Sequence, residues 1–148
     1  MMMRNVLLTA HILFAIVVIG WLAMQSMLIP GAIRRGNAAA VRFGATAAER
    51  LGPVAAVVFL IGLALVLRAK NDGADFDSTW VSVSMLLFIV AILNGSILIA
   101  RAEKSAAEKL EAGQPAPDEA KRVSMLGGIN MLLLTTIVWL MVDKPGAF

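Results

Sequence analysis

Four long apolar blocks alternate with polar segments along the chain. A helix needs about 20 predominantly apolar residues to cross the hydrocarbon core of a bilayer. We place one helix in each block, and we begin the second helix early because residues 38–49 are rich in helix formers. The pattern therefore predicts an all-α membrane protein with a single transmembrane domain over residues 1–148. Its predicted helices span about 5–30, 38–67, 80–104 and 123–142.

Four spans joined by connections of this length predict an up-down-up-down bundle of antiparallel helices. Residues 68–79 are predicted to form a polar turn. The third connection begins as a charged extension of the third helix, in which Glu103 and Lys104 are followed by Glu108 and Lys109. The extension ends at a stretch rich in Gly and Pro, residues that interrupt helices.

The composition supports a membrane protein and excludes several kinds of site. The hydrophobic fraction is 59% and the charged fraction 16%, whereas soluble domains are roughly half apolar and a quarter charged. The chain has no cysteine, so disulfides, thiolate metal sites, iron–sulfur clusters and cysteine nucleophiles are excluded. A net charge of +3 is explained by the basic residues that membrane proteins collect in cytoplasmic loops. We expect no nucleic-acid partner, because no basic fold or motif is present.

His11 is the one histidine of the chain and lies inside the first apolar block. A histidine there can serve as a metal ligand, a haem ligand or a proton relay. The simpler interpretation is a neutral ring that donates a hydrogen bond to a neighbouring carbonyl or to headgroup water, and Asp143 at the end of the fourth block is a candidate partner. We favour it, because a metal site needs a second strong ligand. Soft copper ligands would have to come from scattered methionines: Met24, Met27, Met85, Met125, Met131 and Met141.

Three amides, Gln25, Asn94 and Asn130, lie in the same half of their antiparallel helices. We expect them to face inward at similar depth and to bond across helices, because amides in hydrocarbon need partners. They form either a polar substrate or ion site, or interhelical hydrogen bonds worth about 0.6 kcal/mol each. We favour the structural role, because no acid or base is expected at that depth. Replacing each amide by leucine should then cost about 1 kcal/mol or less.

A charge cluster is predicted at the start of the second helix, where Arg42, Thr46, Glu49 and Arg50 fall on one helical face. Glu49 can pair there with Arg42 or Arg50 at the membrane interface. The cluster is either a docking site for a lipid headgroup or a partner, or an interfacial ion pair of little net value. The sequence leaves both interpretations open.

Two stretches carry a family resemblance: Ala10-His11-Ile12-Leu13 through Gly20-Trp21, and the ending Trp139-Leu-Met-Val-Asp-Lys-Pro-Gly146. In these the chain resembles a bacterial family of small four-helix membrane proteins of unknown function. That family is distantly similar to the membrane domain of CopD-type copper-resistance proteins. The resemblance implies a four-helix bundle in a bacterial plasma (inner) membrane and carries over His11 as a family-like residue. It implies copper only weakly, because this chain lacks further histidines.

The sequence contains no phosphate loop, nucleophile elbow or Ser/His/acid set, so we expect neither enzymatic activity nor a cofactor. We expect a small accessory or structural subunit that packs against other membrane subunits of a respiratory or transport complex, or forms a homo-oligomer. Two alternatives remain: a copper or small-solute permease that uses His11, the methionines and the amide layer, or haem binding shared with a partner chain. Small residues that allow close helix approach support the subunit: Ala55, Ala56, Gly62, Ala91, Gly95, Gly127 and Gly128.

The distribution of basic residues predicts that both termini face away from the cytoplasm. Lys and Arg are concentrated in cytoplasmic loops, and nine of them fall in the first and third connections: Arg34, Arg35, Arg42, Arg50, Arg101, Lys104, Lys109, Lys121 and Arg122. The other side has four: Arg4, Arg68, Lys70 and Lys144. A reporter that is active only outside the cytoplasm should therefore be active when fused after Phe148. Activity of a cytoplasm-only reporter at that position would show the opposite orientation.

Overall fold

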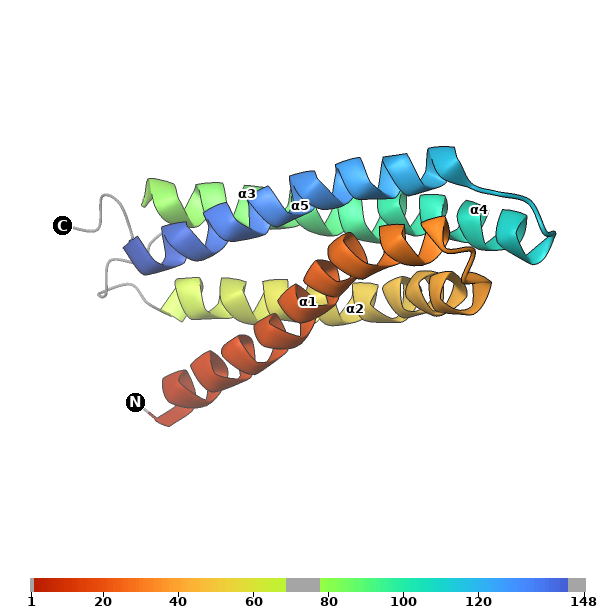
Figure 1. Ribbon diagram of the computed structural model, residues 1–148. Coiled ribbons are helices and arrows are strands. Elements are labelled where there is room, and N and C mark those ends of the chain that lie inside the picture. Colours follow the sequence, from red (N-terminus) through yellow and green to blue (C-terminus); the bar gives the residue numbers. More distant parts are fainter. Residues whose placement is uncertain (1, 69–77, 144–148) are drawn as a thin grey trace.

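A computed structural model describes residues 2–68 and 78–143, and these residues form a helical bundle (Figure 1). The elements are α1 (Met2–Arg34), α2 (Ala38–Arg68), α3 (Thr79–Leu93), the π-helix η1 (Asn94–Ile99), α4 (Ala100–Glu111) and α5 (Pro117–Asp143). α3, η1 and α4 follow one another without a break. The described residues thus contain four helices long and apolar enough to cross a membrane: Met2–Arg34, Ala38–Arg68, Thr79–Glu111 and Pro117–Asp143. The predicted fold class, an all-α four-helix membrane protein, is confirmed.

The helices are longer than the predicted spans, because additional helical turns of polar residues continue beyond the apolar blocks. The third predicted helix continues past residue 104 to Glu111, which agrees with the charged extension expected there. α1 and α4 each end in a glycine with positive φ, Gly36 and Gly113. The next residue of each turn donates its N–H back into the last helical turn: Asn37 to the Ala32 carbonyl and Gln114 to the Lys109 carbonyl. This is the Schellman arrangement, which satisfies carbonyls that a helix end would otherwise leave unpaired.

The helices run antiparallel, so each end of the bundle has its own character. α1 begins and α5 ends at one end, which we call the terminal end (Figure 1). The connections 35–37 and 112–116 lie at the opposite end, which we call the basic end. The predicted turn at 68–79 and the Lys144-Pro-Gly146 ending lie outside the described residues.

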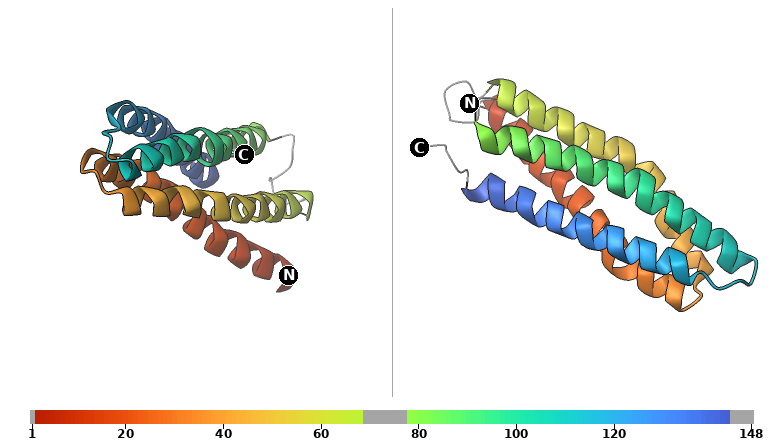
Figure 2. Two further views of the ribbon diagram at one scale, coloured as in Figure 1. Left: turned by 90° about the vertical axis from the view of Figure 1, so that its right-hand side faces the viewer. Right: turned by 90° about the horizontal axis from the view of Figure 1, so that it is seen from above.

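α1 packs between α2 and α5, α4 packs against α2, and α3 packs against α5. The bundle is tightest toward the basic end, where one hydrophobic core includes Ile33, Val41, Ile99 and Val123. The first half of α1 leans away from α5, as both views show (Figures 1 and 2). Val18 is the first buried residue of α1. The basic half of the bundle is therefore the part that can enclose a site.

Small residues allow the helices to approach closely, although not all of the predicted ones do so. Ala55 and Ala91 are buried in the middle of the bundle, whereas Ala56 and Gly128 are exposed. At Gly127 of α5 a Cβ atom would lie 2.9 Å from the Ser26 Cα on α1. Such a separation is too short for real atoms, so the absence of a side chain at this position sets the distance between α1 and α5.

The two adjacent glycines of α5 provide a matched test of this packing. Gly127→Ala should destabilise the folded protein by about 1–3 kcal/mol, because the new methyl group would push against the α1 backbone. Gly128→Ala should be neutral or slightly stabilising, since its Cβ would have nothing within 4 Å and alanine favours the helix. Equilibrium unfolding in mild detergent measures both variants. Equal effects would show that Gly127 does not control the α1–α5 distance.

Candidate functional site

Glu103 is the most unexpected residue of the structure. Its side chain is fully buried, with 0% of its surface exposed, although the sequence suggested a charged helix extension there. The Gln25 amide nitrogen on α1 donates a hydrogen bond of 3.1 Å to the Glu103 Oε2 on α4. The expectation that no acid lies at the depth of the amides is therefore wrong, because a carboxyl group is bonded to one of them.

The other two amides, Asn94 and Asn130, form a pair on the side of this contact that faces the terminal end. The side chains of Asn94 and Asn130 are 7% and 0% exposed. Asn94 Nδ2 donates to the Leu126 carbonyl at 3.0 Å and to Asn130 Oδ1 at 3.4 Å. A Cβ atom on Gly95 would lie 3.4 Å from Asn130 Nδ2 and 3.7 Å from Gln25 Oε1, so Gly95 separates the amide pair from Gln25.

The four side chains Asn94, Asn130, Gln25 and Glu103 thus follow one another toward the basic end, and we call them the polar column. The structure brings together all three amides that the sequence singled out. Two of them bond to each other as expected. The third, Gln25, bonds to the carboxyl group of Glu103, a residue that the sequence pattern assigns to the charged helix extension.

The polar column has unsatisfied bonding capacity. One atom of each side chain lacks a hydrogen-bond partner: Gln25 Oε1, Asn94 Oδ1, Glu103 Oε1 and Asn130 Nδ2. Three of these atoms are oxygens that accept hydrogen bonds or coordinate hard cations. Among the described residues, no lysine, arginine or histidine forms an ion pair with Glu103. The described part of the chain therefore supplies no counter-charge to this carboxyl group.

The π-helix explains how Glu103 comes to face inward. Asn94 and Glu103 are nine residues apart, which in an ideal α-helix is about two and a half turns and would place them on opposite faces. η1 occupies six of these residues, and its wider turns advance through a smaller angle at each residue. The two side chains can therefore both point into the bundle. A π-helical segment frequently marks a functional site.

Two glycines make the space that the column occupies. A Cβ atom on Gly44 of α2 would lie 2.8 Å from Ile29 Cδ1 and 3.5 Å from Glu103 Oε2. A Cβ atom on Gly95 would lie 2.7 Å from Leu22 Cδ2. Side chains at either position would therefore intrude on the groups that enclose the Gln25–Glu103 contact.

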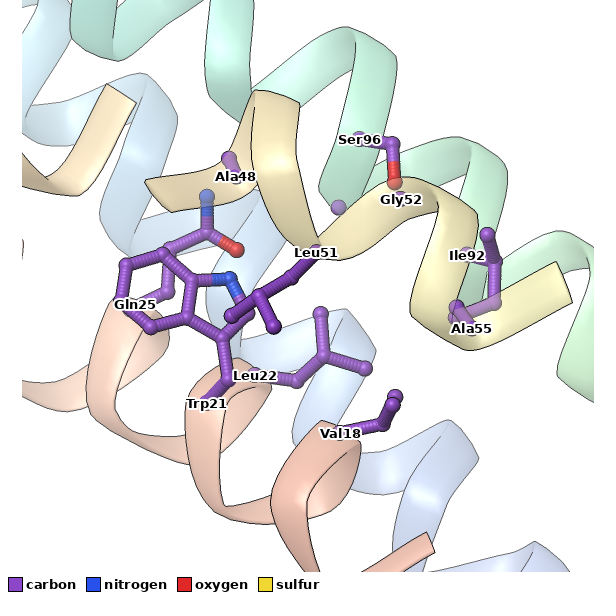
Figure 3. Close-up of a pocket in the computed structure, with 11 residues that line it drawn as sticks. Val18, Trp21, Leu22, Gln25, Ala48, Leu51, Gly52, Ala55, Ile92 and Ser96 are labelled. Atoms are coloured by element: carbon purple, nitrogen blue, oxygen red, sulfur yellow. The ribbon is translucent and has the colours of Figure 1, made fainter. Parts of the chain in front are cut away.

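A small cavity adjoins the column between α1, α2 and η1 (Figure 3). Trp21 and Gln25 line it from α1, Gly52 from α2, and Gly95 and Ser96 from η1. Its volume is about 10 Å³, which is close to the minimum that holds one water molecule. Tryptophans of membrane proteins gather at the membrane interface, but Trp21 lies deeper in its span. Its side chain forms one wall of this cavity.

His11 lies in the other half of the bundle and does not join the column. Its ring packs on α2, where it interacts with the Val58 backbone, and a Cβ atom on Gly62 would lie 3.0 Å from the ring. The ring nitrogen Nδ1 has no hydrogen-bond partner. Asp143, its predicted partner, is exposed at the end of α5. The described residues include no group of three or more His, Asp or Glu side chains that could hold a metal ion.

The predicted charge cluster at the start of α2 is arranged differently from the expectation. Arg42 makes two hydrogen bonds to Glu111 of α4, at 2.9 and 2.6 Å. It therefore links α2 to α4 and does not pair with Glu49. Glu49 and Arg50 are both exposed, and within residues 2–68 and 78–143 neither forms an ion pair.

The comparisons with known proteins identify a family. A family model described as a predicted integral membrane protein (DUF2269) matches residues 5–145, which is nearly the whole chain. No curated protein and no solved structure matches the chain. The match confirms that the resemblance to a family of membrane proteins is correct in its general form.

The contact between Gln25 and Glu103 can be tested by a double-mutant cycle. Gln25→Leu should destabilise the protein by about 1–3 kcal/mol, because it leaves the buried carboxyl group without its donor. This revises the smaller cost expected from the sequence alone. In a Glu103→Leu background the same change should cost much less, since no acceptor is left unpaired. Equal costs in the two backgrounds, measured by unfolding in detergent, would refute the contact.

Proposed function

This chain belongs to the DUF2269 family of predicted integral membrane proteins, and on that premise we propose that it binds a small monovalent cation, a proton or a sodium ion, at Glu103. As part of this proposal, the protein is not an enzyme, and it lies in a bacterial plasma membrane with its basic end at the cytoplasmic side. This proposal extends the small-solute permease hypothesis, because it adds the carboxyl group of Glu103 to the amide layer. The observation that carries it is a fully buried carboxyl group without a counter-charge.

The physical argument rests on the cost of an isolated charge. An ionised carboxylate in an apolar interior is strongly disfavoured unless it is paired and hydrogen-bonded. Glu103 accepts one hydrogen bond, from the neutral amide of Gln25. One hydrogen bond to a neutral group does not replace the hydration of a carboxylate. A cation bound at Glu103 removes this cost, whether it is a proton on the oxygen or a metal ion beside it.

The remaining atoms of the polar column suit such a ligand. Glu103 Oε1 and Gln25 Oε1 are both unpartnered, and oxygen ligands are the ones that hard cations prefer. Ionisable groups inside membrane proteins characteristically mark ion pathways and proton relays. Because Glu103 lies in the basic half of the bundle, we place the site within reach of the cytoplasmic face.

An accessory subunit is the second candidate, and the first half of α1 favours it. Apolar side chains on this segment are largely exposed: Val6 by 61%, Leu13 by 59% and Ile16 by 63%. Since α1 leans away from α5 here, a helix of another membrane subunit or of a second copy can pack against it. A cation site at Glu103 is compatible with this role, because a subunit can contribute an ion site to a larger assembly.

Infrared difference spectroscopy on proteoliposomes tests the cation site directly. The wild-type spectrum minus that of Glu103→Gln isolates the Glu103 carboxyl group. A bound proton predicts the carbonyl band of a protonated acid. A sodium site predicts an ionised carboxylate whose band shifts when sodium replaces choline in the buffer. The matched control is Glu108→Gln, which alters an exposed carboxylate on the same helix.

Two results would contradict the proposal. The first is an ionised Glu103 whose spectrum is unchanged by sodium. The second is a Glu103→Gln spectrum indistinguishable from that of Glu108→Gln, which would mean that Glu103 is solvated like an exposed residue. Co-purification of a partner chain that is unaffected by Glu103→Gln would, together with either result, favour the accessory subunit.

A further inference from the structure

A second feature lies on the outer surface of the basic end, separate from the polar column. A groove of about 390 Å³ lies between the end of α1 and the first turns of α5. Arg34 lines it from α1, and Pro117, Lys121 and Ser124 line it from α5. Met125 closes it on the side of the apolar span and is 60% exposed.

The cations of this groove are not neutralised by the protein. Arg34 and Lys121 are exposed, and in the described part of the chain neither forms an ion pair. The neighbouring Arg35 and Arg122 are likewise exposed and without an ion pair there. By contrast, Arg42 and Lys109 at the same end are paired with Glu111 and Glu119. The positive charge on this face is therefore available to an anion.

An apolar track continues from the groove along the surface of α5. Lys121, Met125, Gly128 and Leu132 are spaced by four, three and four residues, so they share one helical face. All four are exposed, Leu132 by 71%. A Cβ atom on Gly128 would meet nothing within 4 Å, so the track has a shallow indentation at this point. The surface thus changes from cationic to apolar along a single line.

From this arrangement we propose that the groove binds an anionic phospholipid. Its phosphate lies between Arg34 and Lys121, and one acyl chain follows α5 past Gly128. The charge pattern and the apolar track match the two parts of such a lipid, and basic pockets between transmembrane helices are known to bind anionic headgroups. The site is independent of Glu103 and supplies an interaction that does not depend on the proposed cation.

Lipid retention by the purified full-length protein tests this site. Native mass spectrometry in mild detergent measures binding of added phosphatidylglycerol, with phosphatidylcholine as the uncharged comparison. Wild type should bind phosphatidylglycerol preferentially. The Arg34→Gln/Lys121→Gln variant should bind it about tenfold more weakly or worse, because each basic residue contributes to attraction. The matched control, Arg101→Gln/Lys104→Gln, removes two exposed cations of α4 outside the groove and should retain wild-type binding.

Two further arms separate the lipid from other anions. Gly128→Leu should weaken phosphatidylglycerol binding while leaving the charges in place, because it fills the apolar track. Inorganic phosphate in millimolar excess should not displace the lipid. The proposal is overturned if the control variant loses as much binding as the groove variant, if both lipids bind equally, or if inorganic phosphate competes fully.

Discussion

The hydrogen bond between Gln25 and Glu103 is the constraint on which the basic half of the bundle depends. Both side chains are fully buried, and neither can turn to water while the bundle is closed. α1 and α4 must therefore remain in register, with α2 close enough to enclose the carboxyl group. Gly44 supplies that closeness, because any larger residue would meet Ile29 and approach Glu103. The π-helix η1 changes the rotation of the chain between Asn94 and Glu103, so that the Glu103 side chain can face into the bundle. Both backbone features, the glycine at position 44 and the π-helix η1, therefore help to bury the carboxyl group of Glu103.

The fold was predictable from the sequence, because four apolar blocks of membrane-spanning length leave few alternatives. The amide layer was also predictable, since polar groups within such blocks must face inward. Glu103 was missed because it lies in a segment of alternating charges, which the sequence pattern indicates is a charged helix extension, and because the pattern does not reveal the π-helix that precedes it. A signal was nevertheless present. Glu103 lies within the stripe formed by Ile99, Ala102, Ala106 and Leu110, whose helical spacing marks the buried face of α4.

The two halves of the bundle are held together differently. At the basic end, Arg42 joins α2 to α4 through Glu111, and Lys109 joins α4 to α5 through Glu119. Such exposed ion pairs contribute little free energy individually, but they bridge helices that also share a hydrophobic core. In the terminal half, Arg68 of α2 donates a hydrogen bond to the Met3 sulfur of α1, while the first half of α1 leans away from α5 (Figures 1 and 2).

The position of Glu103 agrees better with the proposed cation site than with a purely structural role. A buried polar pair is weak evidence for stability, because apolar residues of similar volume often hold a core together equally well or better. Leucine at both positions would require neither a donor nor an acceptor. The chain instead combines a buried acid, one hydrogen bond, unpartnered oxygens and a π-helical segment. The buried acid, the unpartnered oxygens and the π-helical segment each cost free energy in a simple packing subunit. Each also has a direct use if a cation enters and leaves.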